Sequence, residues 1–549
     1  MLLTEVEKGN MELSNIKDEY FFRIWSLKEA FIKCLGEGLS YGMKNVEFNI
    51  SNKYENIICN VRGFKFKQEK ISINNKEYII SVAWRYAMGN IKNMRDIINY
   101  AAKEYGDNIA FKYKISKNEI ESKSYNDLKY DSEAVSNVLK NLKVLGKHVA
   151  IIGSTSYWWI ISYFGIVNSG GVTVPIDDKL PVNDICELME RADVEVLIYD
   201  NNRVDIAKAV KEKCSKVKHI ISMTEKLNNE FSLSLNKLME NNKGNFFIEL
   251  NNEKLCTILF TSGTTGKSKG VMLNHKNLAD NATACDMGLK PGTVSMTVLP
   301  INHVFCFTMD ILKGIYSGLC ICINDSIIRV SKNLKLFKPE IMCLVPMVIE
   351  GLYNKLMDGS VMLPKKLIAK AALGGNLKTI YSGGAYLNPK YIDGFKEFGI
   401  EIIQGYGMTE CSPVISTNLP GRIKKESVGQ LLPNCEAKIV DEEIYVKGSS
   451  VMMGYYKMLK ETEETLIDGY LKTGDLGYID EDNYLYITGR RKNLIILSNG
   501  ENVSPEELEN ELLINRMIKE IVVSEDKDVI KVEIFPDYDY LDRKKIKNI

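Results

Sequence analysis

The chain has 549 residues, several times the roughly 150 residues of a typical domain, so we expect more than one domain. Hydrophobic residues at 45% and charged residues at 26% exclude a disordered chain, a collagenous fibre and a coiled coil. Lys plus Arg and Asp plus Glu both number 71, so net charge gives no reason to expect a nucleic-acid partner.

The first 88 residues are expected to form a separate α+β lobe. Apolar residues recur at helical spacing from Tyr20 to Leu35, and Gly36 and Gly38 follow, which predicts an amphipathic helix. Strands are predicted at residues 46–50, 57–61 and 78–84, and a linker at residues 87–93.

The helix of this lobe carries a motif at residues 21–39, Phe-Phe-Arg-Ile-Trp-Ser-Leu-Lys-Glu-Ala-Phe-Ile-Lys-Cys-Leu-Gly-Glu-Gly-Leu. The motif resembles the second-lobe signature of surfactin-type phosphopantetheinyl transferases, with matches at Trp25, Lys28, Glu29 and Lys33. The resemblance implies that Glu29 binds Mg²⁺ and that Lys28 and Lys33 contact coenzyme A phosphates. Taken alone, Glu29 and Lys33 would be an exposed i,i+4 ion pair worth about 0.3 kcal/mol.

That family builds its site between two lobes, and its first lobe supplies a Gly-x-Asp-x-Glu metal motif. Nothing of that kind precedes Trp25, and one carboxylate with two lysines leaves a metal under-coordinated. We therefore expect residues 1–88 to be inactive by themselves. We also expect both ends of the chain to be cut from a longer bifunctional protein.

From Met94 to about residue 470, short β-branched runs alternate with helical patterns, which predicts mainly parallel sheets with crossover helices. A strand, helix and strand are predicted at residues 149–153, 157–169 and 171–175, followed by strands at residues 196–199 and 218–222. A hairpin over residues 476–490, turning at residues 480–483, leads into a small final unit.

The strongest local signal is a loop of small hydroxyl residues, glycines and lysines that follows a β run from Thr257. Its glycines permit close backbone approach, its hydroxyls can donate to phosphate oxygens, and its lysines add positive charge. It is not a Walker loop, because only two residues separate Gly263 from Gly266. The loop residues are Thr261, Ser262, Gly263, Thr264, Thr265, Gly266, Lys267, Lys269 and Gly270.

This loop resembles the phosphate-binding signature of the adenylate-forming superfamily, which includes acyl-CoA synthetases, luciferases and the adenylation domains of peptide synthetases. Four more segments resemble the family's motifs in the family's order, at residues 381–387, 404–410, 469–475 and 489–495. The resemblance implies an α/β fold. Its parts would be a large adenylate-forming domain at residues 94–489, with mainly parallel sheets and crossover helices, and a partial small α+β domain at residues 490–549.

The resemblance also implies ATP and Mg²⁺ as cofactors. Activating a carboxylate requires its oxygen to attack the α-phosphorus while pyrophosphate leaves, so donors and cations must stabilise negative charge on both sides. Thr261 to Lys269 would surround the β- and γ-phosphates, Thr409 would lie near the α-phosphate, and Glu410 would bind Mg²⁺.

The remaining roles concern the nucleoside. Gly383, Gly384 and Ala385 would border adenine with Gly407, and Tyr406 would stack on it. Asp475 would accept hydrogen bonds from the ribose hydroxyls, and Arg490 would complement ribose or phosphate oxygens. Taken singly, Asp475 could be a turn residue and Arg490 a surface charge.

His303 lies in Leu-Pro-Ile-Asn-His-Val-Phe at residues 299–305, which resembles the segment where the superfamily places a gate beside the acyl pocket. Amino-acid-activating members carry an Asp just after the gate, where this chain has Val304. An apolar residue cannot neutralise a buried ammonium, so we expect a plain carboxylic acid as the small-molecule partner. Apolar residues suit a fatty acyl chain without fixing its length, namely Phe305, Phe307, Met309 and Ile311.

In this superfamily the small C-terminal domain rotates after adenylation, and Lys492 is the expected hinge. The acceptor would be the thiol of coenzyme A or of a carrier-protein phosphopantetheine arm, which makes an acyl carrier protein a second expected partner. The family's catalytic lysine sits in a Gly-Lys context near the C-terminus, which residues 542–549 do not offer. We therefore expect slow adenylation, because one transition-state cation is absent.

Twelve scattered cysteines without a CxxC pair are expected to be reduced, and four histidines without a cluster give no structural zinc site. We expect no signal peptide and no membrane span, hence a cytoplasmic enzyme. The expected function is an ATP-dependent acid:thiol ligase. The alternatives are a phosphopantetheinyl transferase that uses a first lobe from another chain, and a non-catalytic nucleotide-binding remnant.

Overall fold

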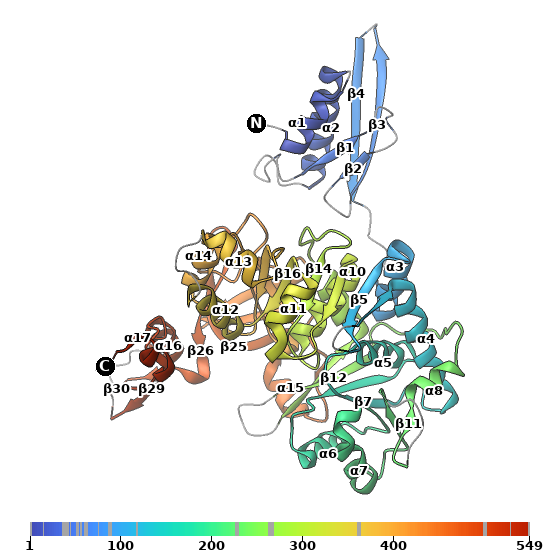
Figure 1. The fold of residues 1–549 in the computed structure, drawn as a ribbon, viewed down its shortest axis with the longest axis vertical. Helices are drawn as coiled ribbons and strands as arrows, with labels where there is room; N and C mark the ends of the chain where they lie inside the picture. Colours follow the sequence, from blue (N-terminus) through green and yellow to red (C-terminus); the bar gives the residue numbers. More distant parts are fainter. Residues whose placement is uncertain are drawn as a thin grey trace. The chain divides into compact units, whose positions relative to one another are not determined.

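The computed structural model describes residues 3–14, 16–35, 43, 46–50, 54, 57–59, 64–74, 76–85, 91–116, 119–224, 230–261, 268–358, 364–497, 502–527 and 529–546. The chain divides into two compact units. Unit 1 is residues 1–91 with residues 286–290, and unit 2 is residues 92–285 with residues 291–549. Figure 1 shows the elements of each.

Unit 1 packs a long helix against an antiparallel hairpin. Apolar residues at helical spacing, including Ile24, Leu27 and Phe31, are fully buried on one face of the helix and form the core with strand residues such as Phe48. The elements are α1 (Glu5–Glu12), α2 (Lys17–Leu35), the pair β1 (Phe48–Ile50) and β2 (Ile57–Cys59), and the hairpin β3 (Phe64–Ile73) and β4 (Lys76–Arg85).

The predicted helix and the three predicted strands of unit 1 are confirmed, with bounds that differ by up to three residues where they are described. Strand β3 was not predicted, because lysines interrupt its apolar residues in Phe-Lys-Phe-Lys-Gln-Glu-Lys-Ile-Ser-Ile. Most of the predicted linker, residues 87–90, lies outside the described residues.

A buried ion pair joins the two helices of unit 1. Lys28 Nζ lies 2.6 Å from Glu7 Oε2, and both side chains are fully buried. Lys28 also donates to the Met43 carbonyl at 2.8 Å, and Glu7 Oε1 accepts from the Phe48 amide at 2.9 Å. The charge of each partner is therefore matched inside the core, which is the condition for burying it.

Unit 2 begins with an eight-stranded sheet whose central strands run parallel, as the alternating pattern predicted. The edge of this sheet is antiparallel. Strand β13 pairs with β12 on one side and with β23 on the other. The strands, in spatial order, are β11 (Leu233–Ser234), β10 (His219–Ser222), β9 (Val196–Tyr199), β7 (His148–Ile152), β8 (Val172–Ile176), β12 (Leu255–Thr261), β13 (Lys269–Asn274) and β23 (Gly454–Tyr455).

A nine-stranded sheet follows, again parallel in the middle with antiparallel edges. Buried apolar residues of β14 to β18 pack against the helices that follow them and form its core. The strands, in spatial order, are β20 (Gln430–Leu431), β19 (Val414–Thr417), β18 (Glu401–Gly407), β17 (Thr379–Ser382), β16 (Ile341–Leu344), β14 (Val294–Thr297), β15 (Cys320–Ile323), β5 (Ile109–Lys114) and β6 (Ile120–Ser124).

Crossover helices connect these parallel strands, and α4 and α5 pack against each other (Figure 1). The helices are α3 (Met94–Tyr105), α4 (Tyr125–Asn141), α5 (Tyr157–Asn168), α6 (Val182–Arg191), α7 (Val204–Lys213), α8 (Leu235–Glu240), α9 (His275–Thr283), α10 (Lys313–Ser317), α11 (Val330–Phe337), α12 (Pro346–Asp358), α13 (Lys365–Ala372), α14 (Pro389–Glu397) and α15 (Leu459–Thr465).

The rest of unit 2 is antiparallel. The predicted hairpin over residues 476–490 is confirmed as β25 and β26, and Lys492 follows it in a single helical turn at Arg491–Asn493. The elements are β21 (Cys435–Val440), β22 (Glu443–Gly448), β24 (Leu466–Ile467), β25 (Tyr470–Ile479), β26 (Leu485–Arg490), β27 (Ile495–Ile496), β28 (Asn502–Val503), α16 (Pro505–Leu512), β29 (Ile518–Asp526), β30 (Val529–Pro536) and α17 (Tyr538–Lys544).

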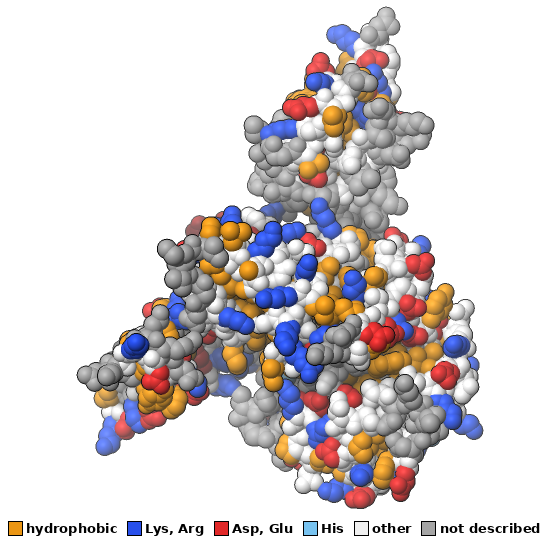
Figure 2. Space-filling model, viewed as in Figure 1, with side chains coloured by type: hydrophobic (Ala, Val, Ile, Leu, Met, Phe, Trp, Pro, Cys, Tyr) orange, Lys and Arg blue, Asp and Glu red, His pale blue; other side chains and the backbone are white. Residues whose placement is uncertain are grey.

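Acidic and basic side chains intermingle on the viewed face of the molecule (Figure 2). Helix α11 exposes Lys332 and Lys335 and contains no acidic residue. None of the twelve cysteines forms a disulfide, as predicted. Among the described helices, none combines the length and apolar character needed to cross a bilayer.

A π-helix at Cys306–Leu312, labelled η4, precedes α10 and is buried almost throughout. Asp310 lies inside it, and its Oδ2 has no hydrogen-bond partner among the described atoms. Burial raises the pKa of Asp310 to about 7, although hydrogen bonds from the Cys343 and Cys306 thiols oppose the shift. The folded chain therefore holds a proton on Asp310 at pH values where the unfolded chain releases it.

We predict that Glu7→Gln destabilises unit 1 by about 3 kcal/mol, because it removes the carboxylate charge from a fully buried ion pair. Hydrogen exchange of α2 in the full chain measures the loss as faster exchange. A second substitution, Lys28→Met, should restore much of the protection, since it removes the buried cation of the same pair. Unchanged exchange in Glu7→Gln would mean that the ion pair does not support the lobe.

We predict that the effect of Asp310→Asn depends on pH. Because the pKa of Asp310 is raised in the folded state, its stabilising contribution is lost as pH rises from about 4 through 7. Asp310→Asn should change the unfolding temperature little at or below about pH 4 and increase stability at pH 8 by on the order of 4 kcal/mol, since the folded and unfolded pKa values differ by about three units.

The matched control for this measurement is Asp325. Burial would raise the pKa of Asp325, but hydrogen bonds from Asn333 and Arg329 lower it. Asp325→Asn should therefore destabilise the chain at pH 8, in the opposite direction. An Asp310→Asn effect of equal size at both pH values would contradict the raised pKa.

Candidate functional site

Strands β12 and β13 hold the two ends of the predicted phosphate loop. Thr261 is the last residue of β12, Lys269 is the first of β13, and the two are directly opposite in the antiparallel ladder. The Thr261 hydroxyl donates to the Lys269 carbonyl at 3.5 Å. The predicted phosphate contacts between them lie outside the described residues, namely Ser262, Gly263, Thr264, Thr265, Gly266 and Lys267.

Gly270 follows Lys269 at a point where the chain is crowded. A Cβ atom there would lie 3.1 Å from Ile258 and 3.2 Å from Phe260, and the Gly270 carbonyl accepts from the Tyr456 amide at 2.7 Å. Glycine thus lets residues 454–456 pair closely with β13. This position serves packing in the described structure.

The turn that carries Glu410 lies between β18 and β19. Thr409–Cys411 form one helical turn, and the Thr409 carbonyl accepts from the Ser412 amide at 3.2 Å. The Glu410 side chain is buried, with 8% of the residue exposed. Its Oε1 accepts from the Tyr455 hydroxyl at 2.9 Å, and its carbonyl accepts from the Met452 amide at 2.8 Å.

Tyr455 links two predicted site residues that come from different sheets. Its hydroxyl binds Glu410, while its ring lies 4.7 Å from Lys269 Nζ, in cation–π range. Burial, and then the negative charge of Glu410, raise the pKa of Tyr455, so it remains a donor. Sequence reasoning missed this residue, and the only signal for it is a glycine followed by two tyrosines at residues 454–456.

The three residues predicted to bind the nucleoside contact one another. They are Tyr406, Asp475 and Arg490. Asp475 and Arg490 are directly opposite in the β25–β26 ladder, with Arg490 Nε 2.8 Å from Asp475 Oδ1. The Tyr406 hydroxyl donates to Asp475 Oδ2 at 2.6 Å, and burial followed by the Asp475 charge raises the pKa of Tyr406. A carboxylate offers about four lone-pair sites, so Asp475 retains capacity for ribose hydroxyls.

The predicted adenine segment follows β17. A Cβ at Gly383 would lie 3.1 Å from the Phe305 ring, so the segment borders the η4 region closely. Gly384 has φ +85°, which favours glycine, and Ala385 is exposed. At Gly407 an added Cβ would lie 1.9 Å from the Pro413 carbonyl oxygen, so only glycine fits there.

His303 is exposed at the start of the turn that leads into η4, and its carbonyl accepts from the Phe307 amide at 3.1 Å. The Phe307 ring packs against Tyr163, with ring centroids 4.1 Å apart. The structure therefore places the predicted gate segment between the aromatic face of α5 and the predicted adenine segment. The gating role of His303 stays a prediction.

In unit 1 the predicted residues separate into two environments. Lys28 is buried with Glu7, whereas Glu29 and Lys33 are exposed one helical turn apart, with 3.6 Å between Lys33 Nζ and Glu29 Oε2. Lys28 already has an anionic partner inside the core. The predicted contacts of Lys28 and Lys33 with coenzyme A stay predictions.

Two lone carboxylates, Glu410 and Glu29, are the predicted Mg²⁺ ligands. In the part of the chain that the structure describes, no three His, Cys, Asp or Glu side chains lie close enough to hold a metal ion together. The donor set at Glu410 nevertheless suits Mg²⁺, which proteins often bind through one or two carboxylates with water and substrate phosphates. Glu410 Oε2 is not used by Tyr455 and is the oxygen that fits this role.

Comparisons with known proteins identify related families. Residues 98–456 match the AMP-binding enzyme family, and residues 2–83 match the 4'-phosphopantetheinyl transferase superfamily. The chain is 27% identical over 429 residues to long-chain-fatty-acid–CoA ligase FadD15 of Mycobacterium bovis, which covers 69% of this chain and 71% of that one.

Two further proteins are similar. Probable 4-coumarate–CoA ligase 1 of Dictyostelium discoideum is 34% identical over 305 residues, which are 51% of this chain and 53% of that one. The anthranilate CoA ligase AuaEII, solved in complex with anthranoyl-AMP, superimposes with a TM-score of 0.73 at 21% identity, over 83% of this chain and 91% of AuaEII. Because the AMP-binding enzyme match spans more than half of the sequence, the chain belongs to that family.

Proposed function

We propose that the chain activates a carboxylic acid with ATP and Mg²⁺ as an acyl-adenylate and transfers the acyl group to the thiol of coenzyme A. The observation that carries the proposal is the meeting of Lys269, Tyr455 and Glu410 from two different sheets. A cation, a phenol donor and a carboxylate thus lie together beside the ends of β12 and β13, between which the phosphate loop is predicted. The likeness to CoA ligases such as FadD15 supports the same reaction.

In the first half-reaction Asp475, Arg490 and Tyr406 would hold the nucleoside, and Thr261 and Lys269 would hold the phosphates. The substrate carboxylate oxygen forms a bond to the α-phosphorus, and the bond to the bridging oxygen breaks as pyrophosphate leaves with the electron pair. Lys269 and Thr409 would stabilise the charge that develops on the phosphate oxygens.

Glu410 would hold Mg²⁺ through Oε2, the oxygen that Tyr455 does not use. When bound, Mg²⁺ neutralises negative charge on the phosphate oxygens. Tyr455 fixes the rotation of the carboxylate by bonding Oε1, and its ring keeps Lys269 Nζ close by. In the second half-reaction the thiol sulfur bonds the carbonyl carbon, AMP leaves, and the thiol proton passes to solvent.

A fatty acid is the substrate class that we infer. The residue after His303 is Val304, which cannot pair with a substrate ammonium. The segment that follows buries Phe307 and Ile311, and Phe305 borders the adenine segment. The likeness to FadD15 supports a long acyl chain over a short one.

A second candidate function concerns the acceptor. The transferase-like match over residues 2–83 raises the prospect that unit 1 takes part in loading a phosphopantetheine arm onto a carrier protein, with Glu29 and Lys33 exposed on α2 for that purpose. The acyl acceptor would then be that arm. A carrier protein and free coenzyme A present the same thiol, so the chemistry at unit 2 is unchanged.

The test of the proposed function is acid-dependent pyrophosphate release by the full chain with ATP, Mg²⁺ and a panel of fatty, aryl and amino acids. We predict release with fatty acids and a thioester product when coenzyme A is added. Glu410→Gln should lower kcat/KM by roughly 10- to 100-fold, because it weakens metal binding. Glu340→Gln, which removes a surface ion pair with Lys378, is the matched control.

Silence with every acid would contradict the proposed function, and release with amino acids alone would contradict the argument from Val304. Equal rates in the Glu410 variant and the parent would remove Glu410 from the metal site. Thioester formed on a phosphopantetheine-bearing carrier protein, but not on coenzyme A, would favour the second candidate acceptor.

We predict that Tyr455→Phe lowers kcat by roughly 10-fold or more, because a hydrogen bond to a charged group contributes about 1.5–3 kcal/mol and the ring over Lys269 remains. Tyr455→Leu, which removes hydroxyl and ring together, should also raise the KM for ATP. Single-turnover rates measure the first effect. An active Tyr455→Phe enzyme with parental kcat would show that Glu410 does not need this hydroxyl.

A further inference from the structure

Helix α9 starts where β13 ends, and it carries three asparagines that are buried despite their polar side chains, Asn274, Asn277 and Asn281. They recur at intervals of three and four residues and so lie along one face of the helix. A buried amide is costly unless its donors and acceptor are used. Their partners therefore reveal what this face of the helix holds in place.

Asn281, with 4% of its surface exposed, forms hydrogen bonds with both ends of the turn that follows Glu410. Its Nδ2 donates to the Cys411 carbonyl at 3.1 Å and the Val414 carbonyl at 2.8 Å, and also contacts Ser450 Oγ at 3.1 Å. Its Oδ1 accepts from the Val414 amide at 3.2 Å. One side chain thus pairs with both ends of residues 411–414, from a position 133 residues away along the chain.

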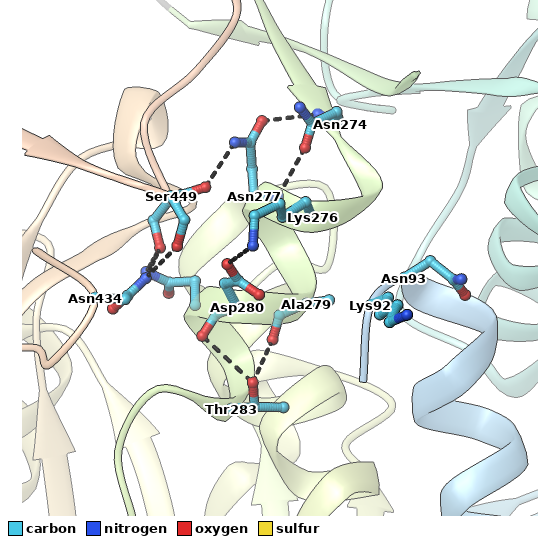
Figure 3. A network of polar contacts seen from close by, with 12 residues as sticks. Lys92, Asn93, Asn274, Lys276, Asn277, Ala279, Asp280, Thr283, Asn434 and Ser449 are labelled. Atoms are coloured by element: carbon cyan, nitrogen blue, oxygen red, sulfur yellow. Dashed lines mark hydrogen bonds and ion pairs between the residues drawn. The ribbon is translucent and has the colours of Figure 1, made fainter. Parts of the chain in front are cut away.

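Asn277 holds a second segment one helical turn away. Its Nδ2 donates to the carbonyls of Ser449 and Val451, at 2.8 and 2.9 Å, and Figure 3 shows it pointing toward Ser449 and Asn274. Asn434 braces the same segment through the Ser449 and Ser450 hydroxyls. This segment then supplies Met452 and Tyr455, the two residues that bond Glu410.

The turn after Glu410 does not have an ordinary backbone conformation. Ser412 has φ +69°, a left-handed value that is unfavourable for a residue with a Cβ and persists only where the surroundings fix it. Its hydroxyl donates to the Ser450 carbonyl at 2.9 Å, and its carbonyl accepts from the Thr308 hydroxyl at 2.8 Å. Asn281 is the side chain that holds both ends of this turn.

We propose that Asn281 and Asn277 are positioning residues for Glu410. Asn281 fixes the backbone on the carboxyl side of Glu410, and Asn277 fixes the segment that brings the Tyr455 hydroxyl to the carboxylate. Because α9 continues directly from β13, the two asparagines set the distance between the end of the phosphate loop and the metal-binding carboxylate. The inference rests on the proposed function of Glu410 and extends it to two residues that touch neither ATP nor metal.

The experiment compares Asn281→Ala and Asn281→Leu with the parent chain. Leu keeps about the size of Asn without its donors and acceptor and adds no charge, so a role in packing alone would leave Asn281→Leu active. We expect both variants to require roughly 10-fold more Mg²⁺ for half-maximal pyrophosphate release and to have a lower kcat. The KM for the acid should stay within about twofold, because the acyl segment is untouched.

The matched control is Asn333→Ala. Asn333 is a fully buried helical asparagine whose amide bonds Asn324 and Asp325, far in sequence from Glu410. It should lower the unfolding temperature without changing the Mg²⁺ requirement. If Asn333→Ala and Asn281→Ala change the Mg²⁺ requirement equally, the effect is one of general loss of stability. That result would overturn the inference.

A double-mutant cycle with Glu410→Gln decides whether Asn281 acts through Glu410. If it does, Asn281→Ala should slow the Glu410→Gln enzyme by less than about twofold, whereas independent action would multiply the two losses. Hydrogen exchange at residues 408–416 needs no turnover and should show lost protection in both Asn281 variants. Unchanged protection there overturns the positioning role even if the parent chain is inactive. An inactive parent, or an unaffected Glu410→Gln enzyme, counts instead against the proposed function.

Discussion

The buried carboxylate of Glu410 is the constraint around which the large unit is organised. A carboxylate taken out of water must be hydrogen-bonded, and the turn that carries it offers no side-chain donor of its own in the described contacts. The donor is Tyr455, which reaches the site from β23 at the edge of the other large sheet. The two sheets therefore meet at Glu410, and the order of strands β12, β13 and β23 can be read as the means of bringing Tyr455 there.

The same constraint explains why the site is assembled from short motifs that lie far apart in the sequence. Lys269 closes the phosphate loop, Glu410 follows β18, and Asp475 lies in a third, antiparallel sheet. Each motif is local, and these three come from three different sheets. Packing between sheets, more than hydrogen bonding within them, sets the distances on which phosphate chemistry depends.

Much of the fold followed from the sequence, because its signals are local. Alternating β-branched runs and helical patterns predicted the parallel core, and the strand at residues 196–199 was predicted with its observed bounds. The resemblance to the adenylate-forming superfamily also indicated Asp475, Arg490 and Tyr406 as site residues, although not their mutual hydrogen bonds. Tyr455 and Asn281 could not be found in this way, because their partners lie 45 and 133 residues away. The burial of Lys28 was likewise hidden, since it depends on Glu7 from another helix.

The direct pairing of Thr261 with Lys269 has a consequence for how tightly a nucleotide can be held. The ladder of β12 and β13 brings the two ends of residues 262–268 together before any ligand arrives. Bringing the two ends of a loop together costs conformational entropy. Here the pairing of β12 with β13 meets that cost when the sheet folds. A phosphate ligand does not have to bring Thr261 and Lys269 together, so that entropic cost is not subtracted from its affinity.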